Sequence, residues 1–116
     1  MATPHKPPVA VRSALRKLGA DIREARLRRG LPARVVADRA FTSRPTLRRI
    51  ETGDHRVGIG IYAAVLHALG MLGALKDLAD PTRDPVGLAL ASEQLPKRAR
   101  LRRPRAASEN EPREQG

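Results

Sequence analysis

Lysine and arginine are the residues of this sequence that most clearly offer a chemical function. They number 23 against 12 Asp and Glu, so the 116-residue chain carries a formal net charge of +11. A strongly positive balance on a small chain favours a polyanion partner, because cationic side chains attract phosphates over a long range. A merely solubilising surface would carry the same charge, so the elements that position these side chains must decide between the two.

Groups that support catalysis or metal binding are scarce. The sequence contains no cysteine, which excludes disulfides, Cys-based zinc sites and thiol nucleophiles. The three histidines, His5, His55 and His67, lie far apart. We find no carboxylate pair at acid–base spacing, no nucleophile beside a base and no glycine-rich phosphate loop. This pattern predicts a protein that is not an enzyme and that uses no metal and no cofactor.

Apolar residues recur at helical spacing through residues 11–80, and only 2% of the chain is aromatic, which disfavours a sheet. The expected fold class is therefore all-α. Five helices are expected at about 11–29, 32–39, 43–52, 58–69 and 72–79. The residues expected on their buried sides are Val11, Leu15, Leu18, Ile22 and Ala25; Val35, Val36 and Ala40; Leu47 and Ile50; Ile61, Val65, Leu66 and Leu69; and Leu72, Leu75 and Leu78.

Both ends of the chain differ in composition from residues 11–80. Residues 1–10 contain three prolines and predict a flexible arm. Residues 81–96 form a short extension in which Val86, Leu88 and Leu90 alternate as in a strand, whereas Leu88, Ala91 and Leu95 fit a helix; we favour the helix. Residues 97–116 have little to bury and are expected to be disordered. Six basic groups in 97–105 fit a solvated tail, an arm on the DNA backbone or a docking segment.

No secretory signal precedes the first expected helix, so a cytoplasmic protein is predicted. The uncharged stretch 59–75 is shorter than the roughly 20 residues that span a bilayer, and it contains three glycines. Two short core helices broken at Gly70 explain this stretch better than a membrane segment.

Residues 32–53 contain two short helices joined by a tight link. Pro32 suits a first helical turn, Ser43 is a good N-cap and Gly53 stops the second helix. Ala37 is small where the helices must approach closely, and Leu47 is apolar where the second helix packs back on the core. This is a helix-turn-helix pattern, in which the second helix enters the major groove of DNA.

The segment from Ala37 to Gly53, ADRAFTSRPTLRRIETG, resembles the Xre/Cro-type helix-turn-helix family, the group of the phage lambda-like repressors. Residues 18–26 resemble the first helix of that family and residues 66–70 the end of its fourth. The resemblance covers roughly residues 12–79 and implies a five-helix lambda repressor-like domain that binds double-stranded DNA. The matching positions are Leu31, Ala37, Ser43, Arg44, Thr46, Leu47, Ile50, Glu51 and Gly53.

The resemblance also implies roles for individual residues. Base contacts are implied for Arg44, Thr46 and Arg49, and for Pro45 through apolar contact alone, because proline has no donor. Arg26 and Glu51 match a pair that forms an internal, structural ion pair. Phosphate contacts are implied for Ser43, Thr52 and Arg56, with Arg34 and Arg48 as neighbours that could join them.

The sequence departs from the family pattern at Phe41, where the family usually has glycine in the turn. A positive φ is costly for a bulky residue. Either the turn differs here or Phe41 is buried as an anchor, and we assign both Phe41 and Tyr62 to the core.

The function expected is that of a sequence-specific transcriptional repressor, a homodimer that reads a two-fold operator in the cytoplasm on the nucleoid. The fifth helix and residues 86–90 are the expected dimer contacts. Residues 58–70, with Leu78-Ala-Asp-Pro and Leu95-Pro-Lys-Arg, resemble HipB antitoxins, which implies a HipA-like kinase toxin as partner. The alternatives are a stand-alone Xre-type repressor and a non-specific basic nucleic-acid binder.

Overall fold

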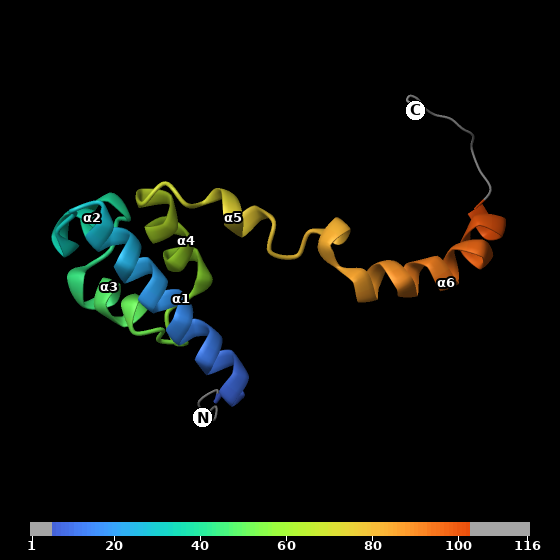
Figure 1. Ribbon diagram of the computed structural model, residues 1–116, viewed down its shortest axis with the longest axis horizontal. Coiled ribbons are helices and arrows are strands. Elements are labelled where there is room, and N and C mark those ends of the chain that lie inside the picture. The colour runs from blue at the N-terminus through green and yellow to red at the C-terminus, as the bar shows by residue number, and fades with distance from the viewer. Residues whose placement is uncertain (1–5, 103–116) are drawn as a thin grey trace. The chain divides into compact units, whose positions relative to one another are not determined.

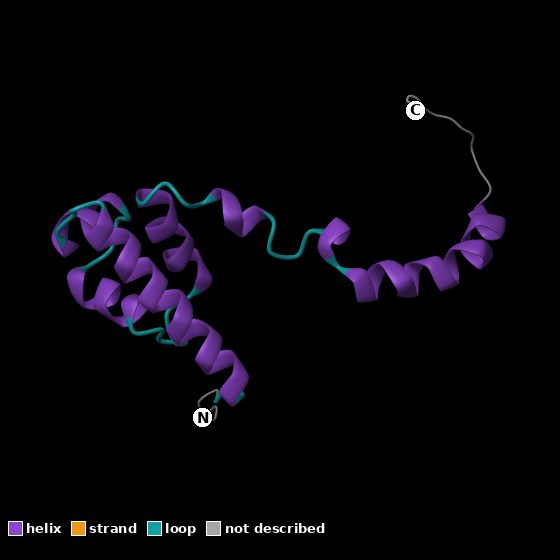
Figure 2. Cartoon of the chain, in the orientation of Figure 1, coloured by secondary structure: helices purple, strands orange, loops and turns teal. Residues whose placement is uncertain are grey.

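The computed structural model describes residues 6–102, and within that range every regular element is helical (Figure 2). The expected all-α fold class is confirmed. The chain divides into two compact units, Met1–Asp77 and Leu78–Gly116. The elements in order are α1 (Val9–Arg28), α2 (Ala33–Arg39), α3 (Arg44–Glu51), α4 (Ile59–Ala68), α5 (Gly73–Lys76), the 3-10 helix η1 (Pro81–Arg83) and α6 (Pro85–Arg102).

Helices α1 to α4 of the first unit gather around one core (Figure 1). Helix α3 packs against both α1 and α2, and α2 also packs against α4. Burying a large aliphatic side chain contributes about 1.5–3 kcal/mol, so this core fixes α3 in the domain. The buried apolar residues are Ile22, Ala25, Val36, Ala37, Ala40, Leu47, Ile50, Tyr62, Val65 and Leu69.

Three residues expected on buried sides are exposed, namely Val11, Ile61 and Leu78, with exposed fractions of 44%, 39% and 75%. Val11 lies in the first turn of α1, before the part of that helix that meets the core. In α4, Tyr62 takes the inward position instead of Ile61. Leu78 lies beyond the end of α5, which stops at Lys76.

The helices extend further toward both ends of the chain than expected. Helix α1 begins at Val9, inside the segment 1–10 expected to be a flexible arm. Helix α6 confirms the helix that Leu88, Ala91 and Leu95 favoured over a strand of Val86, Leu88 and Leu90, and it runs on to Arg102. Helix α6 therefore includes residues 97–102 of the segment expected to be disordered, because lysine, arginine, alanine and leucine all propagate a helix well once it has started. Residues 1–5 and 103–116 lie outside the described residues.

Among the described residues, no helix combines the length and the apolar character needed to cross a membrane.

Candidate nucleic-acid interface

The turn between α2 and α3 carries an aromatic residue and is closed by two backbone hydrogen bonds. The Thr42 amide donates to the Ala37 carbonyl at 2.9 Å, and the Phe41 amide donates to the Asp38 carbonyl at 3.1 Å. Phe41 has a φ of +55° and is 96% exposed. The assignment of Phe41 to the core is therefore wrong: its ring is exposed, and its backbone takes the left-handed conformation that usually favours glycine. Tyr62 is confirmed as a core residue.

Helix α3 has a sharply divided surface. Leu47 and Ile50 are 1% and 0% exposed and face the core. The outer face carries exposed side chains, and in the described part of the chain no residue hydrogen-bonds or ion-pairs with its three guanidinium groups. Their charges are thus available to a ligand. The outer-face residues are Arg44, Pro45, Arg48 and Arg49, followed by Thr52 at the C-cap.

Ser43 and Thr46 build the N-terminal cap of α3. The Ser43 hydroxyl oxygen accepts from the Thr46 amide at 3.2 Å, and the two hydroxyl groups lie 3.0 Å apart in a hydrogen bond. A serine cap of this kind stabilises a helix by about 1 kcal/mol. Thr46 is half-buried whereas Ser43 is exposed. At the other end of the helix, the Thr52 hydroxyl donates to the Arg49 carbonyl at 2.9 Å.

The loop after α3 holds Arg56 in a local ion pair. Its Nε and Nη2 atoms donate to the two carboxylate oxygens of Asp54 at 3.1 and 3.0 Å, and its amide donates to Oδ1 at 2.8 Å. These hydrogen bonds lower the pKa of Asp54 to about 2 and raise the pKa of Arg56. The Tyr62 hydroxyl donates to the Asp54 carbonyl at 2.9 Å, which ties this loop to α4. Arg34 lies exposed in the first turn of α2.

A second ion pair joins α1 to the end of α3. Arg26 Nε and Nη2 donate to the Glu51 carboxylate at 2.7 and 3.1 Å, and Nη1 donates to the Leu31 carbonyl at 3.1 Å. The two side chains are only 12% and 9% exposed. The hydrogen bonds that Arg26 donates to Glu51 raise the pKa of Arg26. Arg26 thereby links α1, α3 and the start of the α2 segment.

Two glycines allow α1 and α3 to approach backbone to backbone. A Cβ added to Gly19 would collide with the Ile50 carbonyl oxygen and lie 2.7 Å from the Gly53 nitrogen. Gly53 has a φ of +78°, and a Cβ there would lie 2.6 Å from the Arg16 Cα. Only a hydrogen atom fits at either position. The two glycines thus allow α1 to lie directly beside α3 and the turn that follows it.

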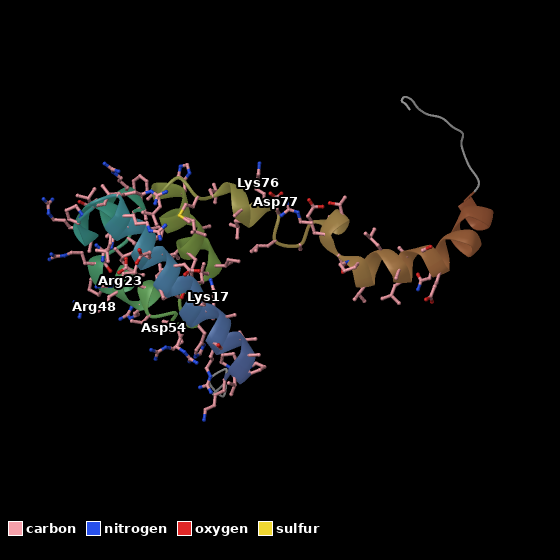
Figure 3. All side chains as sticks on the ribbon, viewed as in Figure 1. Lys17, Arg23, Arg48, Asp54, Lys76 and Asp77 are labelled. Carbon is pink, nitrogen blue, oxygen red and sulfur yellow. The ribbon has the colours of Figure 1, made fainter. Side chains whose placement is uncertain are left out.

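A groove runs between α1, the start of α2 and α3. Its lining includes Arg23 of α1 together with Arg44, Arg48 and Arg49 of α3. Figure 3 labels Arg23 and Arg48, which reach toward the same side of the unit. Sequence reasoning did not single out Arg23. The signal that could have found it is the spacing of Arg12, Arg16 and Arg23, which places them on one flank of α1.

The fold and this arginine-rich face define a helix-turn-helix domain, the domain type of DNA-binding regulators. Comparison with known families agrees: residues 17–79, more than half of the chain, match the family model described as a helix-turn-helix domain. The chain belongs to this family. It matches no curated protein and no solved structure.

Proposed function

We propose that the protein is a sequence-specific transcriptional repressor that acts on chromosomal DNA in the cytoplasm. The observation that carries this proposal is the outer face of α3, where Arg44 and Arg49 are exposed and have no partner within the described residues. Because these guanidinium groups are not bonded within the domain, their donors remain available for hydrogen bonds to base edges. An arginine that bonds a guanine with two parallel hydrogen bonds gives about 1–3 kcal/mol of discrimination.

The remaining contacts follow from position around α3. Pro45 and Thr46 complete the base-reading set, Pro45 by apolar contact and Thr46 through the donor capacity left on its hydroxyl group. The phosphate-contacting set lies on α2, on α3 and in the loops before and after α3, and it fixes register without reading sequence. It comprises Arg34, Ser43, Arg48, Thr52 and Arg56. Arg56 must exchange its bond with Asp54 for a phosphate, so its contribution is smaller than that of an unpaired arginine.

A salt-titrated binding assay tests this function. The full chain is mixed with a duplex from the region upstream of its own gene and with a scrambled duplex of the same composition. At physiological salt, the protein is expected to bind the upstream duplex about a thousand-fold or more tighter than the scrambled duplex, as specific regulators do. Arg49→Ala should reduce this preference about five- to 150-fold. Arg48→Ala, a matched control on the same helix, should weaken binding to both duplexes equally. Equal binding of both duplexes by the natural protein would support a non-specific nucleic-acid binder instead.

The repressor is proposed to act as a homodimer on a two-fold operator, with half-sites about 34 Å apart. Exposed apolar side chains supply contact surface in the expected region: Leu78, Val86, Leu88 and Leu90 are 75%, 69%, 51% and 54% exposed. Sedimentation of the full chain should give twice the monomer mass. A Leu88→Glu variant should lower that mass, and an unchanged mass would place the contact elsewhere.

The same chain is a candidate antitoxin of a HipA-like kinase, in which case it represses its own operon. This second candidate rests on the resemblance of residues 58–70 to HipB antitoxins, and the exposed apolar residues at 86–90 offer it a docking surface outside the helix-turn-helix segment. A kinase-like reading frame next to the gene, and recovery of that kinase with the tagged protein, would support it. Failure to recover the kinase would leave the stand-alone repressor.

A further inference from the structure

The exposed charges of α1 are segregated on two flanks of the helix. On one flank each cation has a carboxylate one turn away. Lys17 Nζ lies 2.6 Å from an Asp21 carboxylate oxygen, and Arg28 Nε lies 3.0 Å from a Glu24 carboxylate oxygen. The positive charges on this flank are therefore balanced by carboxylates of the same helix.

The other flank carries Arg12, Arg16 and Arg23, which are all exposed. Steps of four and seven residues keep the three side chains within one narrow sector of the helix. In the described part of the chain, no carboxylate pairs with any of them. Arg26 continues the row, but its guanidinium is committed to Glu51. The flank therefore holds three unbalanced positive charges.

This flank lies beside the outer face of α3. Arg23 lines the same groove as Arg44 and Arg48. The backbone of Arg16 lies against Gly53, at the end of the α3 segment. The two surfaces lie side by side because α1 and α3 approach closely at Gly19, where no side chain separates the helices. Arg16 and Arg23 of the row on α1 therefore lie beside the basic outer face of α3.

We propose that Arg12, Arg16 and Arg23 form a second contact with the backbone of the same DNA duplex that α3 reads. This inference rests on the proposed DNA-binding function. Arg16 and Arg23 are separated by about 10.5 Å along the helix axis, which is far enough for the two guanidinium groups to reach different phosphates. One arginine row can therefore follow several phosphates of one strand. Such contacts add affinity and salt dependence and carry no sequence information.

The experiment measures binding of the full chain to two unrelated random-sequence duplexes, so that no operator needs to be known. The variants are Arg16→Ala and Arg23→Ala. The matched control is Arg28→Ala, which removes the same charge from the balanced flank of the same helix. Binding is measured over a range of salt concentrations, and circular dichroism checks that each variant is folded.

Each of the two variants should weaken binding about five-fold at 0.15 M salt, since a released counterion contributes a salt slope of about 0.9 per phosphate. The salt slope itself should fall by about 0.9 in each variant. Arg28→Ala should change affinity less than two-fold and leave the slope almost unchanged.

Three results overturn the inference. An equal loss in Arg28→Ala shows that only overall charge matters. Unchanged binding in Arg16→Ala and Arg23→Ala, with strong binding by the natural protein, leaves the row free for an acidic protein partner. A loss confined to one DNA sequence contradicts a backbone contact. Failure of the proposed function is distinct, because it appears in the natural protein as equal binding to the upstream and scrambled duplexes.

Discussion

Replacing Glu51 with leucine removes the counter-charge of a nearly buried guanidinium. Arg26 would keep its hydrogen bond to the Leu31 carbonyl but lose both bonds to the carboxylate. Breaking a buried pair from one side costs about 3–5 kcal/mol. Because the Arg26 side chain is still 12% exposed, we expect the lower end, about 3 kcal/mol. For a domain of this size, the melting temperature should fall by roughly 12–24 °C.

The converse change, Arg26→Met, leaves the Glu51 carboxylate buried without a donor and should cost a similar amount. The double variant Arg26→Met with Glu51→Leu replaces both charges by apolar groups, which pack without an unpaired ion. We expect it to lose only about 1 kcal/mol, less than either single variant. Urea unfolding followed by circular dichroism gives the free energy of unfolding for all four proteins. A double variant whose loss equals the sum of the two single losses would refute the reasoning, since it would show that the charges are not coupled.

Three further perturbations probe the same scaffold. Gly19→Ala forces α1 away from the Ile50 carbonyl and should lower the free energy of unfolding by about 1–3 kcal/mol in urea unfolding. Phe41→Gly relieves the positive φ and should raise that free energy by about 1 kcal/mol, with DNA affinity unchanged. The Asp54 carboxylate should titrate near pH 2 by carbon NMR in the folded protein, below its ordinary 3.8. Since the folded pKa is the lower one, its bond to Arg56 stabilises the fold fully above about pH 5. That contribution is lost as the pH falls through 4 toward 2.

Each of these three predictions has a contradicting outcome. Unchanged unfolding in Gly19→Ala would mean that the helices can separate without cost. A Phe41→Gly protein that is less stable would show that the exposed ring packs on the domain. For Asp54, the control is Arg56→Gln, which should return the carboxyl titration toward 3.8. A midpoint near 3.8 in the natural protein would mean that the loop is not clamped.

Local signals in the sequence were sufficient to predict α2 and α3. The Ser43 cap and the stop at Gly53 mark α3, and a two-residue apolar side, Leu47 and Ile50, fixes its orientation. Orientation is what decides the exposure of the arginines, so the candidate site followed from a few residues. The prediction for α4 was less successful because almost every residue in it is apolar, and a helix without a polar side does not reveal that Tyr62 rather than Ile61 faces inward.

Other features depend on contacts that sequence spacing does not encode. The conformation of Phe41 is set by the packing of α2 on α3, which outweighs the preference of the residue itself. From the sequence alone, Arg56 is expected to be available for a phosphate, whereas the structure shows that it is bonded to Asp54. The spacing of Arg23 places it on one flank of α1, but only the close approach of α1 and α3 at Gly19 makes it part of the candidate interface. In each case a tertiary contact, and not local propensity, determines what the side chain can do.

Among the described residues, the three arginines on the outer face of α3 form no hydrogen bond or ion pair within the domain, whose α3 is held by Leu47, Ile50, Glu51 and the Ser43 cap. These arginines can therefore be exchanged at little thermodynamic cost. Target preference can drift, or be redesigned, while the scaffold stays the same. A chain built in this way separates the evolution of what it recognises from the evolution of how it folds.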